Sequence, residues 1–385
     1  MTPVIVDAIR TPIARIDGAL RDLAAQALAA TLIGAAVERS GLDPARIDEV
    51  ILASATEPQG NLARRAVLDA GLPADVPATT IDRQCGGGLD AIRLAAALVA
   101  GGDAEVVLAG GVESATNSPI RGGAGRDTRR TGGFFPRAAF SGGGYDDPGM
   151  AESAEIIAAE RGITRVRQDR FAAESHVRAA EASTDGVFTD EIVPITGDGV
   201  VIAHDSCPRP RLTEDRMARI PPLLHAEGTV TAGNSSQLAD GGALALVCSP
   251  EMARRLRRPG LSVVASATAG VDPSVCGLGA VAAARRLAER HPRLVAAEAD
   301  TVAFTEAFAA QVLATIDALA LDRERVNPHG GSVGLGHPWA ASGAIQVIRL
   351  FTDIARRHRY GSGLALAAIA GGLGTAMWVE RWEPG

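Results

Sequence analysis

Residues 81–92 read Ile-Asp-Arg-Gln-Cys-Gly-Gly-Gly-Leu-Asp-Ala-Ile, and the rest of the chain is organised around this stretch. Its cysteine, Cys85, lies between a β-compatible segment at 77–81 and an apolar segment at 89–99 with the pattern of a helix. Three glycines follow the thiol and allow a tight turn that brings backbone N–H groups close to whatever the sulfur holds. We expect the start of the helix to favour the thiolate, which would make Cys85 a nucleophile. The structural alternative is a small buried core residue, the usual behaviour of a free cysteine.

The composition limits the kind of protein. With 385 residues the chain exceeds one typical domain, so we expect two or three packed units. A hydrophobic content of 46% with only 3% aromatic residues predicts a core of Ala, Val, Leu and Ile. A net charge of −7 without a basic stripe argues against nucleic-acid binding. All 38 basic residues are Arg, which excludes a lysine Schiff base and leaves anions to Arg, backbone N–H groups or helix ends.

The four cysteines, Cys85, Cys207, Cys248 and Cys276, show neither a Cys-x-x-Cys pair nor ligand spacing, so no metal site is predicted. The sequence also shows no cationic-then-apolar leader and no apolar run of membrane length. We therefore expect a cytoplasmic protein with reduced thiols.

Strand and helix patterns alternate along much of the chain. Strands are predicted at 3–9, 47–55 and 105–111, and a helix rich in Ala and Leu at about 22–40. This alternation predicts a mostly parallel sheet covered by helices.

Between about residues 115 and 165 the pattern changes to long loops rich in Gly, Arg, Ser and Pro. Loops of this length in an enzyme are usually functional or partly disordered. Two interpretations stay open: a solvent-exposed surface loop, or one wall of a binding site for an anionic ligand. The second rests on Arg121, Arg126, Arg129, Arg130 and Arg137.

The C-terminal part repeats the layout around Cys85. A glycine-rich turn at 330–336 presents His337, and a helix at about 341–357, a strand at 364–370 and a Gly-Gly turn follow. We expect two similar halves, each of which presents one loop to a shared centre. His337 is the best candidate for the base of Cys85, because an imidazole paired with a thiol gives a nucleophile able to carry an acyl group.

Five motifs share the pattern of one family: 6–12, 83–89, 109–114, 228–236 and 327–338. On these motifs the chain resembles the thiolase family of acyl-CoA C-acyltransferases over essentially its whole length. The resemblance implies an α/β protein with the thiolase-like five-layered, duplicated α/β/α/β/α fold and an inserted loop domain. We expect an N-terminal half at 1–118 plus about 239–260, the insertion at 119–238 and a C-terminal half at 261–385. It also implies a homodimer or homotetramer.

The resemblance further implies roles for individual residues. Cys85 would take the acyl group from a thioester, and His337 would activate it. Thr305 and Asn327 are also expected in the catalytic set, and the backbone N–H groups of Cys85 and Ala370 would form an oxyanion hole. Residues expected to bind the substrate or CoA are Ser236, Ala232, Gly233, Cys276 and Met150. Coenzyme A would be a substrate thioester, without a bound cofactor.

Two departures from the family pattern bear on the reaction. Ala368 stands where the family has a second cysteine that moves a proton at the α-carbon, and alanine cannot transfer a proton. Thr305 stands where the family has the Asn that holds a water in an oxyanion hole. Losing a general acid or base typically costs about 10²–10⁴ in rate, and losing an oxyanion donor costs a similar factor. Cys276 is either a relocated thiol that replaces the missing one or a small residue lining the pocket.

Three functions stay open. The first is a divergent thiolase that makes or breaks a carbon–carbon bond by a modified proton-transfer route. The second is transfer of the acyl group to an amine, a hydroxyl or water, which needs no carbanion. The third is a non-catalytic thioester-binding partner, against which the Cys85 and His337 pair argues. Acyl-chain length, reaction direction and the choice between CoA and a carrier protein as donor also stay open.

Overall fold

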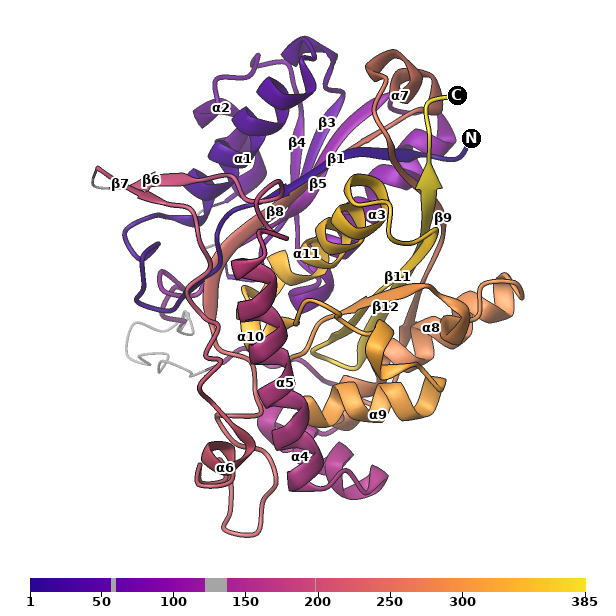
Figure 1. Ribbon diagram of the computed structural model, residues 1–385. Helices are drawn as coiled ribbons and strands as arrows, with labels where there is room; N and C mark the ends of the chain where they lie inside the picture. The colour runs from indigo at the N-terminus through magenta and orange to yellow at the C-terminus, as the bar shows by residue number, and fades with distance from the viewer. Residues whose placement is uncertain (57–59, 122–136, 198) are drawn as a thin grey trace.

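The computed structural model describes residues 1–56, 60–121, 137–197 and 199–385 (Figure 1). In this part of the chain, ten strands form one sheet, and a separate hairpin contains β6 (Ile195–Gly197) and β7 (Val200–Ile202). The strands of the large sheet are, in order, β10 (Thr301–Phe304), β11 (Ser362–Ile369), β12 (Leu373–Trp382), β9 (Gly260–Gly270), β1 (Val4–Arg10), β8 (Ala239–Cys248), β5 (Val106–Ser114), β3 (Glu49–Ala53) and β4 (Ala78–Ile81), with β2 (Ala14–Arg15) beside β8.

The sheet is parallel only towards its two edges. β3 pairs in parallel with β4 and β5, and β10 pairs in parallel with β11, whereas β8, β1, β9 and β12 pair antiparallel with their neighbours. The prediction of a mostly parallel sheet is therefore wrong. The pair Gly371 and Gly372, with φ of 80° and 76°, turns β11 directly back into β12. In the N-terminal part, the chain returns from the insertion so that β8 runs antiparallel between β5 and β1.

Of the four clusters of buried hydrophobic side chains in the described residues, the three larger ones separate five layers. The central cluster surrounds α3 and α11, which cross the middle of the molecule between two parts of the sheet (Figure 1). The two outer clusters lie under α1 and α2 on one side and under α8 and α9 on the other. The five-layered arrangement is confirmed. These helices are α1 (Ala25–Ser40), α2 (Leu62–Asp69), α3 (Gly87–Gly101), α8 (Gly279–Arg290), α9 (Ala309–Leu319) and α11 (Trp339–Phe351).

Strand β1 shows how the sequence builds these layers. Val4 and Val6 pack into the outer cluster under α1, and Ile5 and Ala8 pack into the central cluster. Side chains alternate between the faces of a strand, so a continuous apolar run serves a strand covered on both sides. The strand predicted at 3–9 is confirmed.

Residues 119–238 contain α4 (Met150–Arg161), α5 (Arg165–Thr184) and α6 (Glu214–Met217). The prediction of loops throughout 115–165 is wrong at α4. Just before this helix, the Gly149 backbone N–H donates to Glu152 Oε2 at 2.6 Å. A Glu three residues inside a helix start is a known capping signal. Three members of the predicted Arg wall, Arg126, Arg129 and Arg130, lie outside the described residues. The remaining α-helices of the described chain are α7 (Pro250–Leu256) and α10 (Ser332–Leu335).

A buried charge cluster joins β1 to the insertion and to α11. The Arg10 side chain is fully buried, and its Nε lies 2.7 Å from Glu191 Oε1. Its Nη1 and Nη2 donate to both carboxylate oxygens of Asp205 at 2.7 and 2.8 Å. Glu191 also pairs with Arg349 and accepts from Thr352 Oγ1 at 2.8 Å. Although burial raises the pKa of Glu191, Arg349 and Arg10 hold it below its ordinary value.

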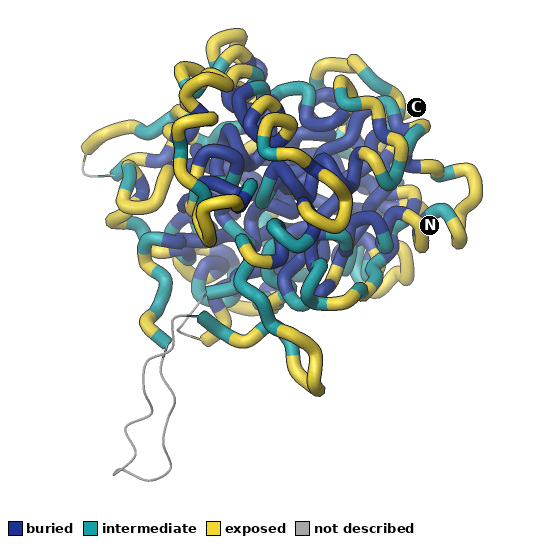
Figure 2. Tube along the Cα trace, turned by 90° about the horizontal axis from the view of Figure 1, so that it is seen from below, coloured by how far each residue is buried: buried dark blue, intermediate teal, exposed yellow. Residues whose placement is uncertain are grey.

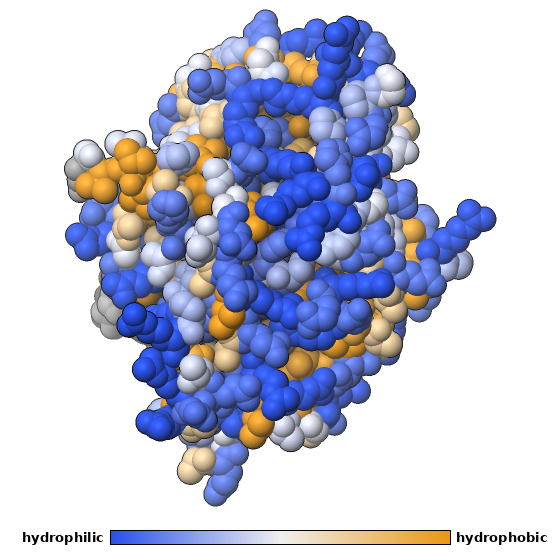
Figure 3. All heavy atoms as spheres, in the orientation of Figure 1, coloured by the Kyte–Doolittle hydropathy of each residue, from blue (hydrophilic) through white to orange (hydrophobic). Residues whose placement is uncertain are grey.

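The outer surface is mostly polar. Figure 2 shows the buried segments gathered in the interior and the exposed residues at the periphery, on loops and on the outer sides of helices. On the face in Figure 3, an apolar patch lies over the β6–β7 hairpin, where Val200 and Val201 are 62% and 63% exposed. Among the described residues, no helix combines the length and the apolar character that a membrane span requires.

Replacing Arg10 with Met should destabilise the fold strongly, because it leaves Glu191 and Asp205 without their buried cation. We expect a loss of about 3–5 kcal/mol in the free energy of unfolding, measured by urea titration at fixed protein concentration. The matched control is Arg46→Met, which removes an exposed ion pair with Glu105 and should cost less than about 1 kcal/mol. Equal, small losses in both variants would contradict a structural role for the cluster.

Candidate active site

Cys85 lies where β4 passes into the central helix α3. A short 3-10 turn at Gln84–Gly86 carries it, and α3 continues from Gly87. Gln84 has a φ of 45°, a left-handed conformation that is uncommon outside glycine. Asp82 Oδ1 holds this turn by accepting from the Gln84 backbone N–H at 2.7 Å and from its Nε2 at 3.0 Å. The backbone is thus bent sharply immediately before the sulfur.

The glycines after Cys85 serve close packing. None of the three has a positive φ. A Cβ at Gly86 would lie 2.2 Å from Ile369 Cδ1, and one at Gly88 would lie 2.7 Å from Ala340 O. The expectation of a glycine-dependent turn is therefore wrong, since these residues allow the start of α3 to touch β11 and α11.

The thiol of Cys85 is neutral in the resting protein. Burial is the main cause that raises the pKa of Cys85 to about 12, and nearby Cys276, Glu113 and Asp82 contribute to the same shift. This overturns the expectation that the helix start favours the thiolate, because desolvation outweighs the helix dipole here. The thiol must lose its proton to a base during the reaction.

His337 precedes α11 in a buried position, 4% exposed. Its backbone N–H donates to Gln237 O at 2.9 Å, and its Nδ1 lies 2.6 Å from Ser342 Oγ. Burial lowers the pKa of His337 to about 4, so the imidazole is neutral at physiological pH. With the proton on Nδ1 donated to Ser342, Nε2 keeps a lone pair that can accept a proton.

The starts of α3 and α11 lie against each other. A Cβ at Gly87 would touch Ala340 Cβ at 3.6 Å, and one at Gly343 would lie 3.3 Å from Gly86 O. This contact brings the Cys85 turn and the His337 turn to one end of the two central helices.

Cys85 opens onto an outer cavity of about 750 Å³. One wall is formed by Trp339, next to His337, and by Leu238. Another wall comes from the insertion, where Arg121 donates to Ala55 O at 3.0 Å and Arg137 pairs with Asp147 at 2.8 Å. The lining residues are Ala55, Thr56, Gln84, Cys85, Ser118, Pro119, Ile120, Arg121, Arg137, Ala138, Phe140, Met150, Leu238, Trp339 and Ala370.

Behind the sulfur lies a smaller inner cavity of about 40 Å³. Cys85, Ala368 and Cys276 all line it, and Cys276 Sγ lies 3.4 Å from Ser153 Oγ. The other lining groups are mostly apolar: Met150, Ala154, Ile157, Gly277, Ala307, Phe308, Gln311, Ile369 and Ala370. This space suits a short acyl chain attached to Cys85.

Two backbone N–H groups remain free at the outer cavity. Those of Cys85 and Ala370 find no acceptor on another described residue, and both residues line the cavity. Free N–H groups beside a nucleophile can stabilise the oxyanion that forms when it attacks a carbonyl group.

Thr305 follows β10 and is 1% exposed. Its backbone N–H donates to Leu366 O of β11 at 3.3 Å, and its Oγ1 accepts from Gln346 Nε2 at 3.0 Å. β10 and β11 are parallel, so their carboxyl ends place Thr305 and Ala368 at the same edge of the sheet.

The comparisons with known proteins agree with this geometry. The family description "Thiolase, N-terminal domain" matches residues 3–251, and "Thiolase, C-terminal domain" matches residues 258–381. The chain belongs to the thiolase family. It is 40% identical to an acetyl-CoA acetyltransferase of Cupriavidus necator over 390 residues, which cover 98% of this chain and 99% of that protein.

Two further relatives cover nearly the whole chain. A β-ketoadipyl-CoA thiolase of Acinetobacter baylyi is 39% identical over 402 residues, 98% of either chain. The crystal structure of a Bacillus anthracis acetyl-CoA acetyltransferase matches with a TM-score of 0.91 and 36% identity, covering 99% of both chains.

The predicted residues of this thiolase fall into three places. Cys85, Ala370, Met150 and Cys276 line the cavities. Ser236 donates its N–H to Ala307 O at 2.9 Å, beside the inner cavity. Ala232 and Gly233 lie farther along the same segment, where a Cβ at Gly233 would meet Ile220 and Met217.

Asn327 supports the thiolase site from behind. Its side chain bonds both backbone groups of Phe304 at 2.9 Å and donates to Glu306 Oε1 at 2.7 Å. Glu306 also accepts from Ser175 Oγ at 2.7 Å. These contacts make Asn327 a group that positions the end of β10.

Three buried polar groups near the site were not predicted: Ser342, Gln346 and Glu113. Glu113 accepts from Ser54 Oγ and the Ala55 N–H at 3.0 and 2.9 Å, and from the N–H of Ala340 at 3.4 Å. It thereby joins one wall of the outer cavity to α11. The sequence did carry a signal for Ser342 and Gln346. Their i, i+4 spacing places both on one face of the helix that follows His337.

Metal ligation is not apparent in the described part of this thiolase. No cluster of three or more His, Cys, Asp or Glu side chains there could hold a metal ion.

The pKa values predict a flat pH profile for acylation of Cys85. His337 is deprotonated above about pH 4, and Cys85 stays protonated below about pH 12. The acylation rate at low thioester concentration should therefore change little between about pH 6 and about pH 9. Rapid-quench measurement of the acyl-enzyme tests this, and an inflection within that range would contradict a neutral resting pair.

Proposed function

We propose that this thiolase forms an acyl-enzyme on Cys85 and then makes or breaks a carbon–carbon bond by a modified proton-transfer route. As a member of the family, the chain is an acyltransferase that acts on acyl-CoA thioesters. The observation that carries the proposal is the close contact between the starts of α3 and α11, which brings the turn of His337 to the Cys85 turn, and Cys85 opens onto a cavity with free N–H groups.

In the first half-reaction, Cys85 Sγ attacks the thioester carbonyl carbon while its proton passes to His337 Nε2. The N–H groups of Cys85 and Ala370 would stabilise the oxyanion. The bond to the departing CoA sulfur then breaks, and His337 returns the proton to that sulfur. The acyl chain would enter the inner cavity, where apolar walls exclude water.

In the second half-reaction, a proton must leave the α-carbon of the acceptor thioester. Ala368, 9% exposed, lines the inner cavity but has no proton to exchange. Cys276 supplies another thiol to the same cavity. We therefore propose that Cys276 replaces the missing cysteine as the protein group that takes the α-proton. A substrate group or a water molecule is the alternative proton acceptor.

The second candidate function is acyl transfer to an amine, a hydroxyl or water. The methyl side chain of Ala368 favours this second function. A methyl group cannot take a proton from an α-carbon, and transfer to these acceptors needs no carbanion. Detection of 3-ketoacyl-CoA, formed or cleaved at useful rates, decides against this candidate.

The insertion at 119–238 would form the groove for CoA or for an acyl-carrier protein. Its residues Ile120, Arg121, Arg137, Phe140 and Met150 line the outer cavity. The halves at 1–118 plus about 239–260 and at 261–385 would supply Cys85 and His337, respectively.

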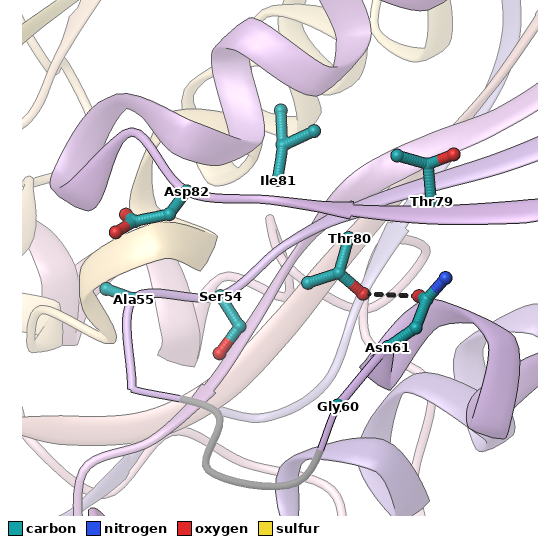
Figure 4. A pocket seen from close by; sticks show the side chains of 8 residues that line it. All are labelled: Ser54, Ala55, Gly60, Asn61, Thr79, Thr80, Ile81 and Asp82. Atoms are coloured by element: carbon teal, nitrogen blue, oxygen red, sulfur yellow. Dashed lines mark hydrogen bonds between the residues drawn. The ribbon is translucent and has the colours of Figure 1, made fainter.

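A homodimer or homotetramer is proposed from the free edge of the sheet. β4 ends the sheet order, and an open cavity of about 450 Å³ lies beside it (Figure 4). There Thr80 Oγ1 donates to Asn61 Oδ1 at 2.7 Å, and neither Cys85 nor His337 lines the cavity. An unpaired edge strand is usually covered by another chain or element. Light scattering that shows a monomer would contradict this proposal.

The proposed reaction needs no bound cofactor, because its atoms and electrons balance with the thioester substrates alone. We also propose a cytoplasmic location, which fits the supply of acyl-CoA. Fractionation of the native cells tests the location.

Incubation with short acyl-CoA thioesters should add one acyl mass to the protein, because Cys85 and its base are both in place. Intact-mass spectrometry and peptide mapping should find the acyl group on Cys85, and Cys85→Ala should abolish it. An unmodified wild-type protein across the panel would contradict both candidate functions.

Ala368→Cys should increase the formation of 3-ketoacyl-CoA by about 10²–10⁴, since it restores an acidic proton beside Cys85. Ala368→Ser, similar in size but far less acidic, is the matched control and should give little increase. The reverse test is Cys276→Ala, which should lower the wild-type rate. An unchanged rate in that variant removes Cys276 from the proposed route.

A further inference from the structure

Gln346 is a buried amide in the second turn of α11, 5% exposed. Its Nε2 donates to Thr305 Oγ1 at 3.0 Å and to the backbone oxygen of Ser342 at 3.1 Å. An amide nitrogen carries two protons, so both are used in these contacts. The arrangement fixes the side chain between α11 and the end of β10.

The first contact decides which way the Thr305 hydroxyl points its proton. Because Oγ1 accepts from Gln346, its own proton is free to donate elsewhere. In the described chain, no acceptor receives that proton, although Thr305 is 1% exposed. A buried donor without a partner costs free energy, so the position is suited to an acceptor brought by a ligand or a water.

The second contact links Gln346 to the base. The backbone oxygen of Ser342 accepts from Gln346 Nε2, and the Oγ of the same serine lies 2.6 Å from His337 Nδ1. His337 and Thr305 are therefore connected through Ser342, whose hydroxyl contacts His337 and whose backbone oxygen accepts from Gln346, and through Gln346 itself. The two ends of this connection are the imidazole and a hydroxyl with a free proton.

We propose that Gln346 is a positioning residue that aims the Thr305 hydroxyl proton at a thioester carbonyl oxygen, directly or through a water. The inference rests on the proposed function, because it assigns the oxygen of the acceptor thioester to this end of the site. Gln346 thus supplies from α11 the amide that a threonine side chain lacks.

The kinetic test is a double-mutant cycle with Gln346→Leu and Thr305→Val, two replacements of similar volume. Each should lower carbon–carbon bond formation or cleavage by about 10²- to 10³-fold, with the rate of Cys85 acylation nearly unchanged. The double variant should be no slower than Thr305→Val, because Gln346 acts through that hydroxyl. Multiplicative effects, or equal losses in both half-reactions, would overturn the proposal.

Gln168→Leu is the matched structural control. Gln168 is fully buried, and its Nε2 makes the same kind of bonds, to Ile163 O at 3.1 Å and to Thr229 Oγ1 at 2.9 Å. This variant should lower the melting temperature without separating the two half-reactions. The same behaviour in Gln346→Leu would show a purely structural role.

A spectroscopic readout separates this inference from the proposed function. In the Cys85→Ala background, the carbonyl stretch of bound ¹³C-labelled acetyl-CoA should shift to lower frequency. Gln346→Leu and Thr305→Val should each reduce the shift by the same amount, and the part that remains should come from the backbone N–H groups of residues 85 and 370. If the shift depends on Gln346 but the wild type makes no 3-ketoacyl-CoA, the proposed function fails and the positioning role stands. A shift that neither replacement changes would overturn the inference.

Discussion

Close contact between the backbones of α3 and α11 is the constraint on which the site depends. A Cβ at Gly88 would lie 2.7 Å from Ala340 O, and one at Gly343 would lie 2.7 Å from Leu89 N. The two helices touch where both begin, so the turns that precede them lie side by side. A larger residue at the contact would separate the sulfur from the imidazole while leaving both groups intact, because packed interiors accommodate added volume only by shifting.

Burial at this contact also sets the electrostatics of the site. Desolvation disfavours both the thiolate and the imidazolium, so the resting pair is neutral. Charge would develop only as the thioester is attacked, beside the free N–H groups of Cys85 and Ala370. Such preorganised donors are most effective where water is excluded. The apolar inner cavity fits the same scheme, since it would shield an acyl-enzyme from hydrolysis.

Local sequence patterns predicted much of this architecture. The turns that carry Cys85 and His337 were found because glycines and a helix pattern flank each of them, and β1 was found from its mostly apolar residues, which only Asp7 interrupts. The direction of the sheet was not predictable in this way, because strand pairing depends on distant contacts such as those of β8 with β5 and β1. The thiolate expectation failed because it considered the helix start and omitted desolvation. Ser342 and Gln346 were missed because their i, i+4 spacing, although visible in the sequence, is shared by many polar pairs on helices and becomes specific only when their partners are known.

The Arg10 cluster has a consequence for how the chain unfolds. Glu191 and Asp205 belong to the insertion, Arg10 to the first strand and Arg349 to the last central helix. Opening any one of these segments alone would leave unpaired charges in a water-poor interior, a state of high free energy. The segments are therefore coupled into one cooperative unit, in which local opening of the insertion is suppressed and its detachment coincides with global unfolding.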